Sequence, residues 1–235
     1  MRTMGIIGGA CVLAIGLLLA GGCGGATGKA AGLKGHWAFD EAAGDLVKNA
    51  AGPNDGRIQG GLKRADGKQG KAIAFDGKGY VLIAHAACLN APQYTFVAWV
   101  KLKDTGEHHY IAWRGGPEFP EDKECRSIDL WLTTDGRLSG YFDIQAGGSR
   151  PQLEGAKKVA DDLWHLVACV ADGKKITFYV DGAKDGEVTL DGSLAKSEFP
   201  LWIGARPGDV AATGLIDEVR FFDRALAPAE IAELK

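Results

Sequence analysis

Short apolar runs separated by Asp-Gly pairs are the feature that most constrains what this chain can fold into. Three such pairs, Asp135-Gly136, Asp172-Gly173 and Asp181-Gly182, follow or separate runs rich in β-branched and aromatic residues. Asp-Gly in this setting is a strong β-hairpin signal, because glycine supplies the positive φ that tight turns need. Turn signals recur about every 8 to 15 residues, which is typical of an antiparallel β-sandwich. The sequence therefore predicts an all-β fold.

The expected strands are short and lie within one domain. They are two runs around a glycine-rich turn in 72–83, and the segments 94–102, 128–132, 138–144, 163–171, 175–180, 201–204 and 215–222. Only residues 228–234 predict a helical turn, which Pro228 opens. No proline-rich or serine-rich stretch interrupts the chain, so we predict a single domain over residues 33–235.

Composition excludes several classes of protein. The chain has 235 residues, of which 46% are hydrophobic and 24% charged, and this balance excludes disorder for most of it. Its 35 glycines have no three-residue period and it has only 8 prolines, which excludes collagen. The formal net charge of -3 leaves no basic surplus for phosphate groups, so we do not expect nucleic-acid binding.

The first 22 residues have the order of a secretory signal peptide. Arg2 is the only charge before Lys29, and the apolar run 6–20 lies between them. Small residues follow this run, as they do at a signal-peptide cleavage site. The run is shorter than the roughly 20 apolar residues of a spanning helix, which favours a signal peptide over a retained anchor.

Residues 19–23 resemble a bacterial lipoprotein lipobox, in which the cysteine is acylated and becomes the mature N-terminus. The motif reads Leu-Ala-Gly-Gly-Cys, with Ala20 where the usual pattern has leucine. The resemblance implies lipidation of Cys23, and the small residues around it predict a flexible tether over 23–32. Gly24 follows this cysteine, at a position where an aspartate would favour retention at the inner membrane. The resemblance therefore favours the outer membrane as the location. The alternative is ordinary cleavage near Gly22, which gives a secreted protein.

Three further cysteines follow in a chain predicted to be exported, where disulfides are permitted. Cys88 and Cys125 both lie near turn-like sequence, whereas Cys169 lies within an alternating apolar run. We favour a Cys88–Cys125 disulfide and a buried free thiol at Cys169. The alternative is that no disulfide forms.

A series of short motifs occurs in a recognisable order over residues 33–234. The motifs are HWAFDE (36–41), GPNDG (52–56), GKAIAFDG (70–77), YTFVAWV (94–100), WHLVA (164–168), FYVDG (178–182), LWIG (201–204), GLIDEVRFF (214–222) and RALAPAEI (224–231). Each motif is weak alone, but together they resemble the LamG-like jelly roll of the concanavalin A-like lectin/glucanase superfamily. The resemblance implies a two-sheet antiparallel jelly roll whose first and last strands lie side by side.

No catalytic motif accompanies this resemblance. The related β-glucan hydrolases carry Glu-x-Asp-x-Glu on one strand, so that the carboxylates share a face. The acidic cluster here, Glu118, Glu121, Asp122 and Glu124, has a different spacing. It also contains Pro117 and Pro120, which predict a solvated loop rather than a central strand. No nucleophile motif, phosphate-binding loop or zinc-ligand spacing occurs either, so we do not expect an enzyme.

The sequence predicts structural roles for the histidines. His108 and His109 are adjacent and would point in opposite directions on a strand, which favours a polar loop that begins a strand over a metal site. His165 follows Trp164 at a family position.

A structural calcium ion is the best metal hypothesis. Asp40 ends the first strand motif and Asp217 lies in the last one. If the jelly roll is right, these strands are neighbours, and both carboxylates could reach one ion. In the alternative, Asp40 caps its loop by accepting amide hydrogen bonds, and Asp217 pairs with Arg220 or Lys34.

Aromatic and planar polar residues in the middle of the chain suggest a glycan site. Sugars stack on aromatic faces and hydrogen-bond to planar polar groups, and the candidates are Trp113, Arg114, Trp131, Tyr141, Gln145 and Arg150. A sandwich core also needs large aromatic side chains. We expect Trp37, Trp99, Trp164 and Trp202, which match family positions, in the core. For Trp113 and Trp131 the core is favoured over a ligand site.

Together these observations favour a non-catalytic binding module on a bacterial cell surface, with a carbohydrate or a protein as its ligand. One alternative is a structural surface protein without a specific ligand. The other is a polysaccharide-active enzyme of the glucanase or lyase type. Fold resemblance alone does not identify the ligand.

Overall fold

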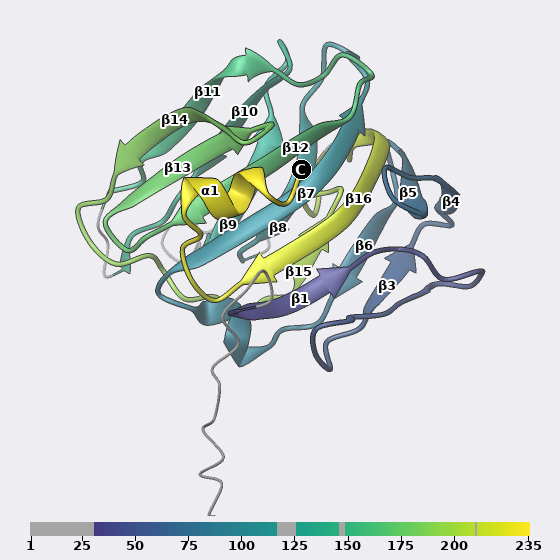
Figure 1. The fold of residues 1–235 in the computed structure, drawn as a ribbon, viewed down its shortest axis with the longest axis horizontal. Helices are drawn as coiled ribbons and strands as arrows, with labels where there is room; N and C mark the ends of the chain where they lie inside the picture. The colour runs from purple at the N-terminus through teal and green to yellow at the C-terminus, as the bar shows by residue number, and fades with distance from the viewer. Residues whose placement is uncertain (1–30, 117–125, 146–148, 210) are drawn as a thin grey trace, which may run out of the picture.

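Two antiparallel sheets face each other across a shared apolar core (Figure 1). The computed structural model describes residues 31–116, 126–145, 149–209 and 211–235. Sheet A has the order β14 (Ala183–Thr189), β13 (Lys175–Val180), β12 (His165–Ala171), β7 (Tyr94–Leu102), β16 (Thr213–Phe222), β5 (Lys71–Asp76) and β4 (Lys63–Asp66), with β1 (Leu33–Trp37) also paired to β16. Sheet B has the order β11 (Gln152–Lys158), β10 (Arg137–Tyr141), β9 (Ile128–Leu132), β8 (His109–Arg114), β15 (Leu201–Ile203), β6 (Tyr80–Ile83), β3 (Gly56–Gln59) and β2 (Leu46–Val47).

This arrangement confirms the predicted two-sheet fold. The first strand, β1, pairs with the last, β16, from Leu33 opposite Phe222 to Trp37 opposite Val219. The only α-helix in the described part of the chain is the short α1 (Pro228–Ala232), at the predicted helical turn. A 3₁₀ helix, η1 (Ala87–Asn90), lies before β7.

The Asp-Gly pairs form turns where the sequence predicts them. They join β9 to β10, β12 to β13 and β13 to β14, and all three pairs of strands are antiparallel. Gly136, Gly173 and Gly182 have φ of 82°, 87° and 81°, which a residue with a Cβ rarely adopts. The two runs in 72–83 behave differently, because β5 belongs to sheet A and β6 to sheet B. The glycine-rich turn between them therefore crosses from one sheet to the other.

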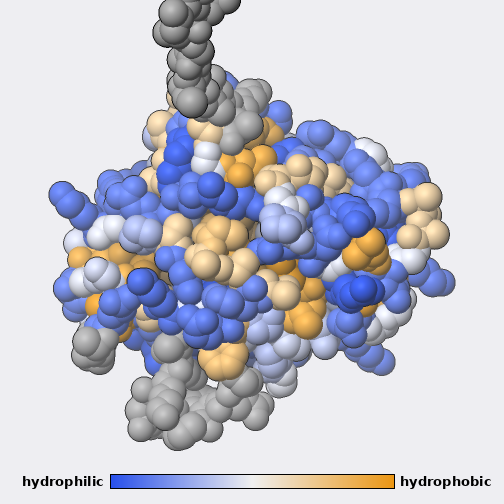
Figure 2. Space-filling model, turned by 90° about the horizontal axis from the view of Figure 1, so that it is seen from below, coloured by the Kyte–Doolittle hydropathy of each residue, from blue (hydrophilic) through white to orange (hydrophobic). Residues whose placement is uncertain are grey.

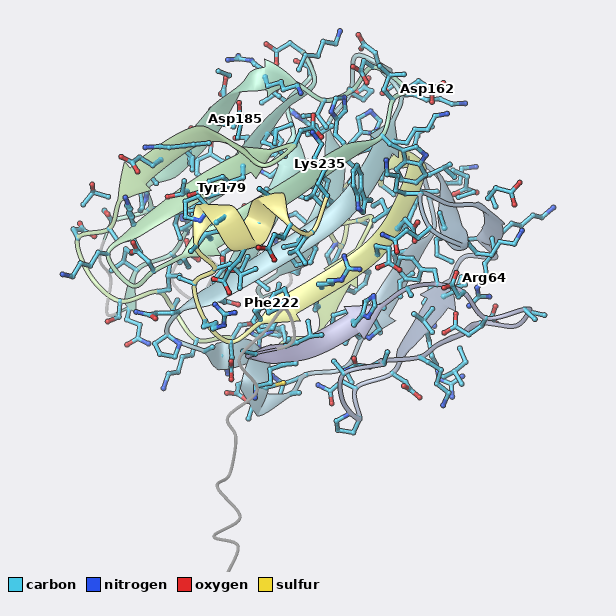
Figure 3. All side chains as sticks on the ribbon, in the orientation of Figure 1. Arg64, Asp162, Tyr179, Asp185, Phe222 and Lys235 are labelled. Atoms are coloured by element: carbon cyan, nitrogen blue, oxygen red, sulfur yellow. The ribbon has the colours of Figure 1, made fainter. Side chains whose placement is uncertain are left out.

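Alternation along the strands divides the apolar residues between two faces. On β7, Phe96, Ala98 and Val100 belong to the main core between the sheets. Val97 and Trp99 point the other way and belong to a second cluster on the outer face of sheet A. The second cluster also contains Leu226 and Ile231, from the C-terminal segment that carries α1, and Figure 3 shows Tyr179 and Phe222 beside this helix. The outer face of sheet A is thus covered by the end of the chain.

Asp185 joins the edge strands of the two sheets (Figure 3). This β14 carboxylate accepts hydrogen bonds at Oδ1 from the backbone N–H of Ala156 at 3.2 Å and of Lys157 at 2.9 Å, both on β11. A Cβ at Gly155 would lie 1.9 Å from Asp185 Oδ2, so the close approach requires glycine. The contact occupies backbone groups that an edge strand would otherwise expose.

The outer surface offers few large apolar groups. Seen from below, hydrophobic groups form small separate patches among hydrophilic ones (Figure 2). Among the described residues, Leu163 is the only large hydrophobic side chain that is largely exposed, at 61%. A single exposed leucine needs no functional explanation.

Candidate ligand-binding face

The outer face of sheet B carries a cluster of aromatic side chains that is separate from the main core. Tyr110, Trp113 and Trp131 are its buried members, and the half-buried Tyr141 and Trp202 pack against them. We call these five residues the aromatic face.

Strand alternation places the cluster outside the sandwich. On β9, Ile128, Leu130 and Leu132 face the main core. Asp129 and Trp131 therefore point to the outer side. Trp202 lies between Leu201 and Ile203 of β15, which also face the core, and so it points outwards as well.

The strand register brings the rings together. Tyr110 lies opposite Trp131 in the β8–β9 pairing, and Trp113 lies opposite Trp202 in the β8–β15 pairing. The ring centroids of Tyr110 and Trp131 are 6.1 Å apart, and those of Trp131 and Tyr141 are 6.4 Å apart. Trp202 also contacts Tyr80 of β6, with ring centroids 4.1 Å apart. Aromatic rings thus extend across five adjacent strands, from β6 to β10.

Two arginines lie over this surface. The guanidinium of Arg206 is 6.0 Å from the Trp113 ring centroid, and its Nη1 donates a hydrogen bond to the Tyr110 hydroxyl at 3.2 Å. Arg126 lies 5.8 Å from the centroid of the Tyr141 ring. Both distances fall within the range of cation–π contacts. Burial raises the pKa of Tyr110 to about 12, so its hydroxyl stays protonated at neutral pH.

Asp129 places a carboxyl group among the rings. It is opposite Trp113 in the β8–β9 pairing and is only 3% exposed. Its Oδ2 accepts a hydrogen bond from the backbone N–H of Tyr141 at 3.3 Å. Burial raises the pKa of Asp129 to about 7, so its neutral and charged forms both occur near neutral pH.

Unpaired polar atoms are concentrated on this side of sheet B. In the described part of the chain, eight buried side-chain nitrogen or oxygen atoms have no hydrogen-bond partner. Four of them are Trp113 Nε1, Trp131 Nε1, His108 Nδ1 and Asp129 Oδ1. Buried polar groups are almost always hydrogen-bonded, so four such atoms in one region require an explanation. All four atoms lie beside flat apolar rings and are shielded from solvent in this structure.

The predicted positions of the tryptophans need correction. Trp113 and Trp131 are buried, at 2% and 9% exposure, but on the outer face of sheet B rather than in the main core. Trp202 is half-buried on the same face, because its neighbours on β15 fill the core side. Trp164 is only partly buried, against the cluster on the outer face of sheet A.

The other two tryptophans expected in the core are buried. Trp37 belongs to the main core. Trp99 is also buried, but on the outer face of sheet A, where Lys68 Nζ lies 4.2 Å from its ring centroid.

The predicted planar polar residues do not form one site. Tyr141 belongs to the aromatic face, whereas Arg114 is fully buried and hydrogen-bonds to η1. Arg150 forms an ion pair with Asp143 at 2.7 Å. Gln145 is exposed beyond the end of β10.

The adjacent histidines separate as predicted, because β8 begins at His109. The ring of His108 meets that of Trp131 edge-on, with centroids 4.7 Å apart. The buried His109 instead accepts a hydrogen bond at Nδ1 from the backbone N–H of Thr213, on sheet A. His165 lies with Nδ1 2.8 Å from Asp181 Oδ2, which is a structural contact.

Asp40 and Asp217 both contact the turn between β4 and β5. Asp40 Oδ1 accepts a hydrogen bond from the backbone N–H of Lys71 at 2.7 Å. Asp217 Oδ2 accepts hydrogen bonds from the N–H groups of Lys68 and Gln69, at 2.8 and 3.0 Å. Burial raises the pKa of Asp217 to about 6.

Two roles are predicted for these carboxylates, namely a shared calcium ion or separate local contacts, and the geometry can be compared with each. Asp217 pairs with neither predicted cation, since Arg220 contacts Glu218 and Lys34 contacts Asp223. Within the described ranges, no group of three or more His, Cys, Asp or Glu side chains is placed to hold a metal ion. The shared calcium ion stays a prediction.

The cysteine predictions are settled in part. Cys169 is a buried free thiol, as predicted, and burial raises its pKa to about 12. Cys88 is half-buried. Cys125 lies outside the described residues, so the Cys88–Cys125 pairing stays a prediction. Cys23, with the leader, and the acidic loop with Glu118 and its neighbours also lie outside them.

Sequence reasoning missed Tyr110, Trp202 and Asp129 as members or neighbours of the candidate site. A signal for Asp129 was present, because the alternation Ile-Asp-Leu-Trp-Leu over Ile128–Leu132 places Asp129 and Trp131 on one face. No comparable signal identifies Tyr110, since the register of β8 shifts between Tyr110 and Ala112.

A family model described as the concanavalin A-like lectin/glucanases superfamily matches residues 75–232. This match covers more than half of the chain. A search of curated proteins finds no match. Within the described residues, no helix is both long and apolar enough to cross a membrane.

Solved structures share the fold at low sequence identity. The binding domain of Paraclostridial Mosquitocidal Protein 1 is 15% identical with a TM-score of 0.69, over 88% of this chain and 52% of that one. Domain 4 of the arabinanase AbnA from Geobacillus stearothermophilus, solved with arabinotriose, is 20% identical with a TM-score of 0.63, over 86% of this chain and 97% of that one. Trypanosoma rangeli sialidase is 18% identical with a TM-score of 0.64, over 87% of this chain and 33% of that one. The chain thus spans about half of the mosquitocidal protein's binding domain and a third of the sialidase.

Proposed function

We propose, on the premise that this chain belongs to the concanavalin A-like lectin/glucanases superfamily, that it is a non-catalytic module that binds carbohydrate on its aromatic face. The observation that carries the proposal is the row of aromatic rings across β6 to β10, in which Tyr80, Trp202 and Tyr141 are partly exposed. Sugars present apolar C–H faces and hydroxyl groups together. A surface that combines aromatic rings with the guanidinium groups of Arg126 and Arg206 matches both.

The similar structures support a binding module at a coarser level. One is a domain solved with arabinotriose and another is the binding domain of a mosquitocidal protein, so this fold serves to bind ligands in other proteins. At these identities the likeness shows the fold alone, and the choice of carbohydrate rests on the aromatic face.

A non-catalytic role is favoured by how the carboxylates of Asp129 and Asp143 are used. Glycoside hydrolysis generally needs two carboxyl groups beside the sugar, one acting as an acid and the other as a nucleophile or base. Asp129 has an unpaired oxygen, but Asp143 is held by Arg150 and accepts a hydrogen bond from the backbone N–H of Arg126. Release of reducing sugar from polysaccharides by the purified protein would instead support the alternative, a polysaccharide-active enzyme.

A glycan array tests the proposal directly. We expect the wild-type chain to bind a defined set of glycans, and Trp131→Ala to weaken that binding about tenfold or more, because Tyr110 and Tyr141 lose the ring beside which they lie. Trp131→Phe keeps a ring but removes the N–H donor, and should give an intermediate loss. Trp164→Ala is the matched control, since it removes a half-buried tryptophan on the other sheet.

Each variant is first checked for folding by circular dichroism. If no glycan binds the wild-type chain, or if Trp131→Ala and Trp164→Ala bind equally well, the aromatic face is not a carbohydrate site. A protein ligand, or a structural surface role without a ligand, would then be favoured.

We further propose that the protein is exported and anchored by a lipid on Cys23, with the outer membrane favoured. The lipobox-like residues 19–23 support this, with Ala20 as the departure from the usual pattern. Metabolic labelling with a palmitate analogue should mark the wild-type protein and not Cys23→Ser. A soluble, unlabelled wild-type protein would support ordinary cleavage near Gly22.

A further inference from the structure

A second cleft lies away from the aromatic face, at one end of the sandwich. It has a volume of about 400 Å³, within the range of small-molecule sites. Its walls come from η1 and the segment that leads into β7, from the start of β9, and from the loops after β10 and before β15. The polar residues that line it include Asn90, Gln93, Ser127, Gln145, Ser193 and Lys196.

A buried arginine organises one wall of this cleft. Arg114 is fully buried, and its Nη1 donates hydrogen bonds to Leu89 O at 3.1 Å, Asn90 Oδ1 at 2.9 Å and Ser127 Oγ at 2.8 Å. All three acceptors belong to residues that line the cleft. The guanidinium therefore fixes the wall in one conformation.

The positive charge of Arg114 has no direct carboxylate partner among the described residues. Its other partners are Ser197 O and His85 Nδ1, and the ring of His85 leads on to Glu198 at 3.2 Å. The Glu198 side chain is 83% exposed, so water screens its charge. Burial lowers the pKa of Arg114 to about 10, which still leaves it charged at neutral pH. A buried cation with a distant counter-charge leaves positive potential in its surroundings.

Among the described residues, the lining presents hydrogen-bond donors and carries no acidic side chain. Asn90 Oδ1 already accepts hydrogen bonds from Arg114 and, at 3.0 Å, from the backbone N–H of Ser197. The free end of the Asn90 amide is therefore its NH₂ group. Lys196, which is exposed, adds an ammonium group on the loop before β15. These groups suit an anionic ligand group rather than a cation.

We propose that this cleft is a second binding site, specific for a sugar residue that bears a carboxylate, such as a uronic acid. Lys196 and the Asn90 amide contact the carboxylate, and the amide and hydroxyl side chains of Gln145 and Ser193 contact the ring hydroxyls. The cleft is larger than a bare carboxylate needs, and its amides and hydroxyls match a polyhydroxylated ligand. This site does not depend on carbohydrate binding by the aromatic face.

Isothermal titration calorimetry with galacturonic acid, galactose and acetate tests the site. We expect galacturonic acid to bind more tightly than either galactose or acetate. Lys196→Gln should weaken galacturonic acid binding about tenfold or more, because a charge-assisted hydrogen bond is lost. Asn90→Asp should weaken it similarly, since it keeps an acceptor for Arg114 but places a negative charge in the wall. Lys103→Gln, an exposed lysine at the far end of β7, is the matched control and should bind normally.

Three results would overturn the proposal. They are equal binding of galacturonic acid and galactose, unchanged binding by Lys196→Gln, and the absence of galacturonic acid binding to the wild-type chain. Trp131→Ala separates the two sites, because it should leave galacturonic acid binding unchanged. Loss of that binding in Trp131→Ala would show that the aromatic face, and not this cleft, holds the acid.

Discussion

Replacing Asp129 by asparagine tests whether a buried carboxyl group on the aromatic face makes the protein less stable at neutral pH. Asp129 is 3% exposed, and its one hydrogen bond to the described residues comes from the backbone N–H of Tyr141. Burial raises its pKa from 3.8 to about 7. Asparagine has nearly the same shape, keeps an acceptor for the Tyr141 amide and carries no charge. The substitution therefore removes the titration and little else.

The sign of the effect follows from where the proton is bound. Between pH 3.8 and about 7, the folded protein keeps the Asp129 proton and the unfolded chain releases it. The free energy of unfolding therefore falls as pH rises through this window, by 1.36 kcal/mol per pH unit for one group. The whole window corresponds to a loss on the order of 4 kcal/mol, and above pH 7 the loss is constant. Asp129→Asn lacks this loss, so its stability relative to wild type should rise with pH.

Urea unfolding followed by tryptophan fluorescence, at several pH values between about 4 and 8.5, measures this difference. Asp135→Asn is the matched control, because Asp135 is an exposed turn residue whose pKa is lowered by hydrogen bonds from Thr133 and Arg137. Its contribution has the opposite sign, since stability from a lowered pKa is lost as pH falls. A difference between wild type and Asp129→Asn that does not change with pH, or that falls as pH rises, would refute the reasoning.

Three further predictions concern the edges, the core and the metal. Asp185→Ala should lower the free energy of unfolding by about 1–3 kcal/mol and promote aggregation, because two β11 amides lose their acceptor; unchanged urea unfolding and light scattering would contradict this. Gly204→Ala should lower the free energy of unfolding by about 2–4 kcal/mol, because φ is +83° and a Cβ would overlap a core phenylalanine ring. Gly61→Ala, at φ +72° with open space around it, should lower the same quantity by only about 1 kcal/mol. Calcium at about millimolar concentration should raise the Tm of wild type by a few degrees and not that of Asp40→Asn, and equal shifts would argue against an ion shared with Asp217.

Local sequence signals predicted the elements that depend on local chemistry. The Asp-Gly turns and the apolar strands β7, β9, β12 and β13 were all expected, because their turn residues and alternation are visible within a few residues. The edge strand β11 was not expected. Its sequence QLEGAKK buries only Leu153 and Gly155, so no apolar pattern marks it. Its pairing depends instead on β10 and on the contact with Asp185.

The candidate site could be predicted only in part. The sequence indicated Trp113 and Trp131 as aromatic candidates but could not tell which side of the sheet they occupy. Both sides of a strand are apolar in parts of this fold, as Phe96 and Trp99 of β7 illustrate. Trp202 is expected in the core because it matches a family position. Its neighbours on β15 face the core instead, so Trp202 points to the outer side. Such assignments depend on strand register between distant segments, which spacing along the chain does not reveal.

Comparison of the two outer faces explains why we propose ligand binding on sheet B. Both outer faces bury a tryptophan, Trp99 on sheet A and Trp131 on sheet B. Trp99 shares its cluster with Leu226 and Ile231 of the C-terminal segment, so the chain itself supplies an apolar cover. No C-terminal residue belongs to the cluster around Trp131, and in the described part of the chain its members are all aromatic side chains from the strands of sheet B. Tyr141 and Trp202 of this face stay partly exposed, and the C–H groups of the proposed carbohydrate ligand would pack on such rings.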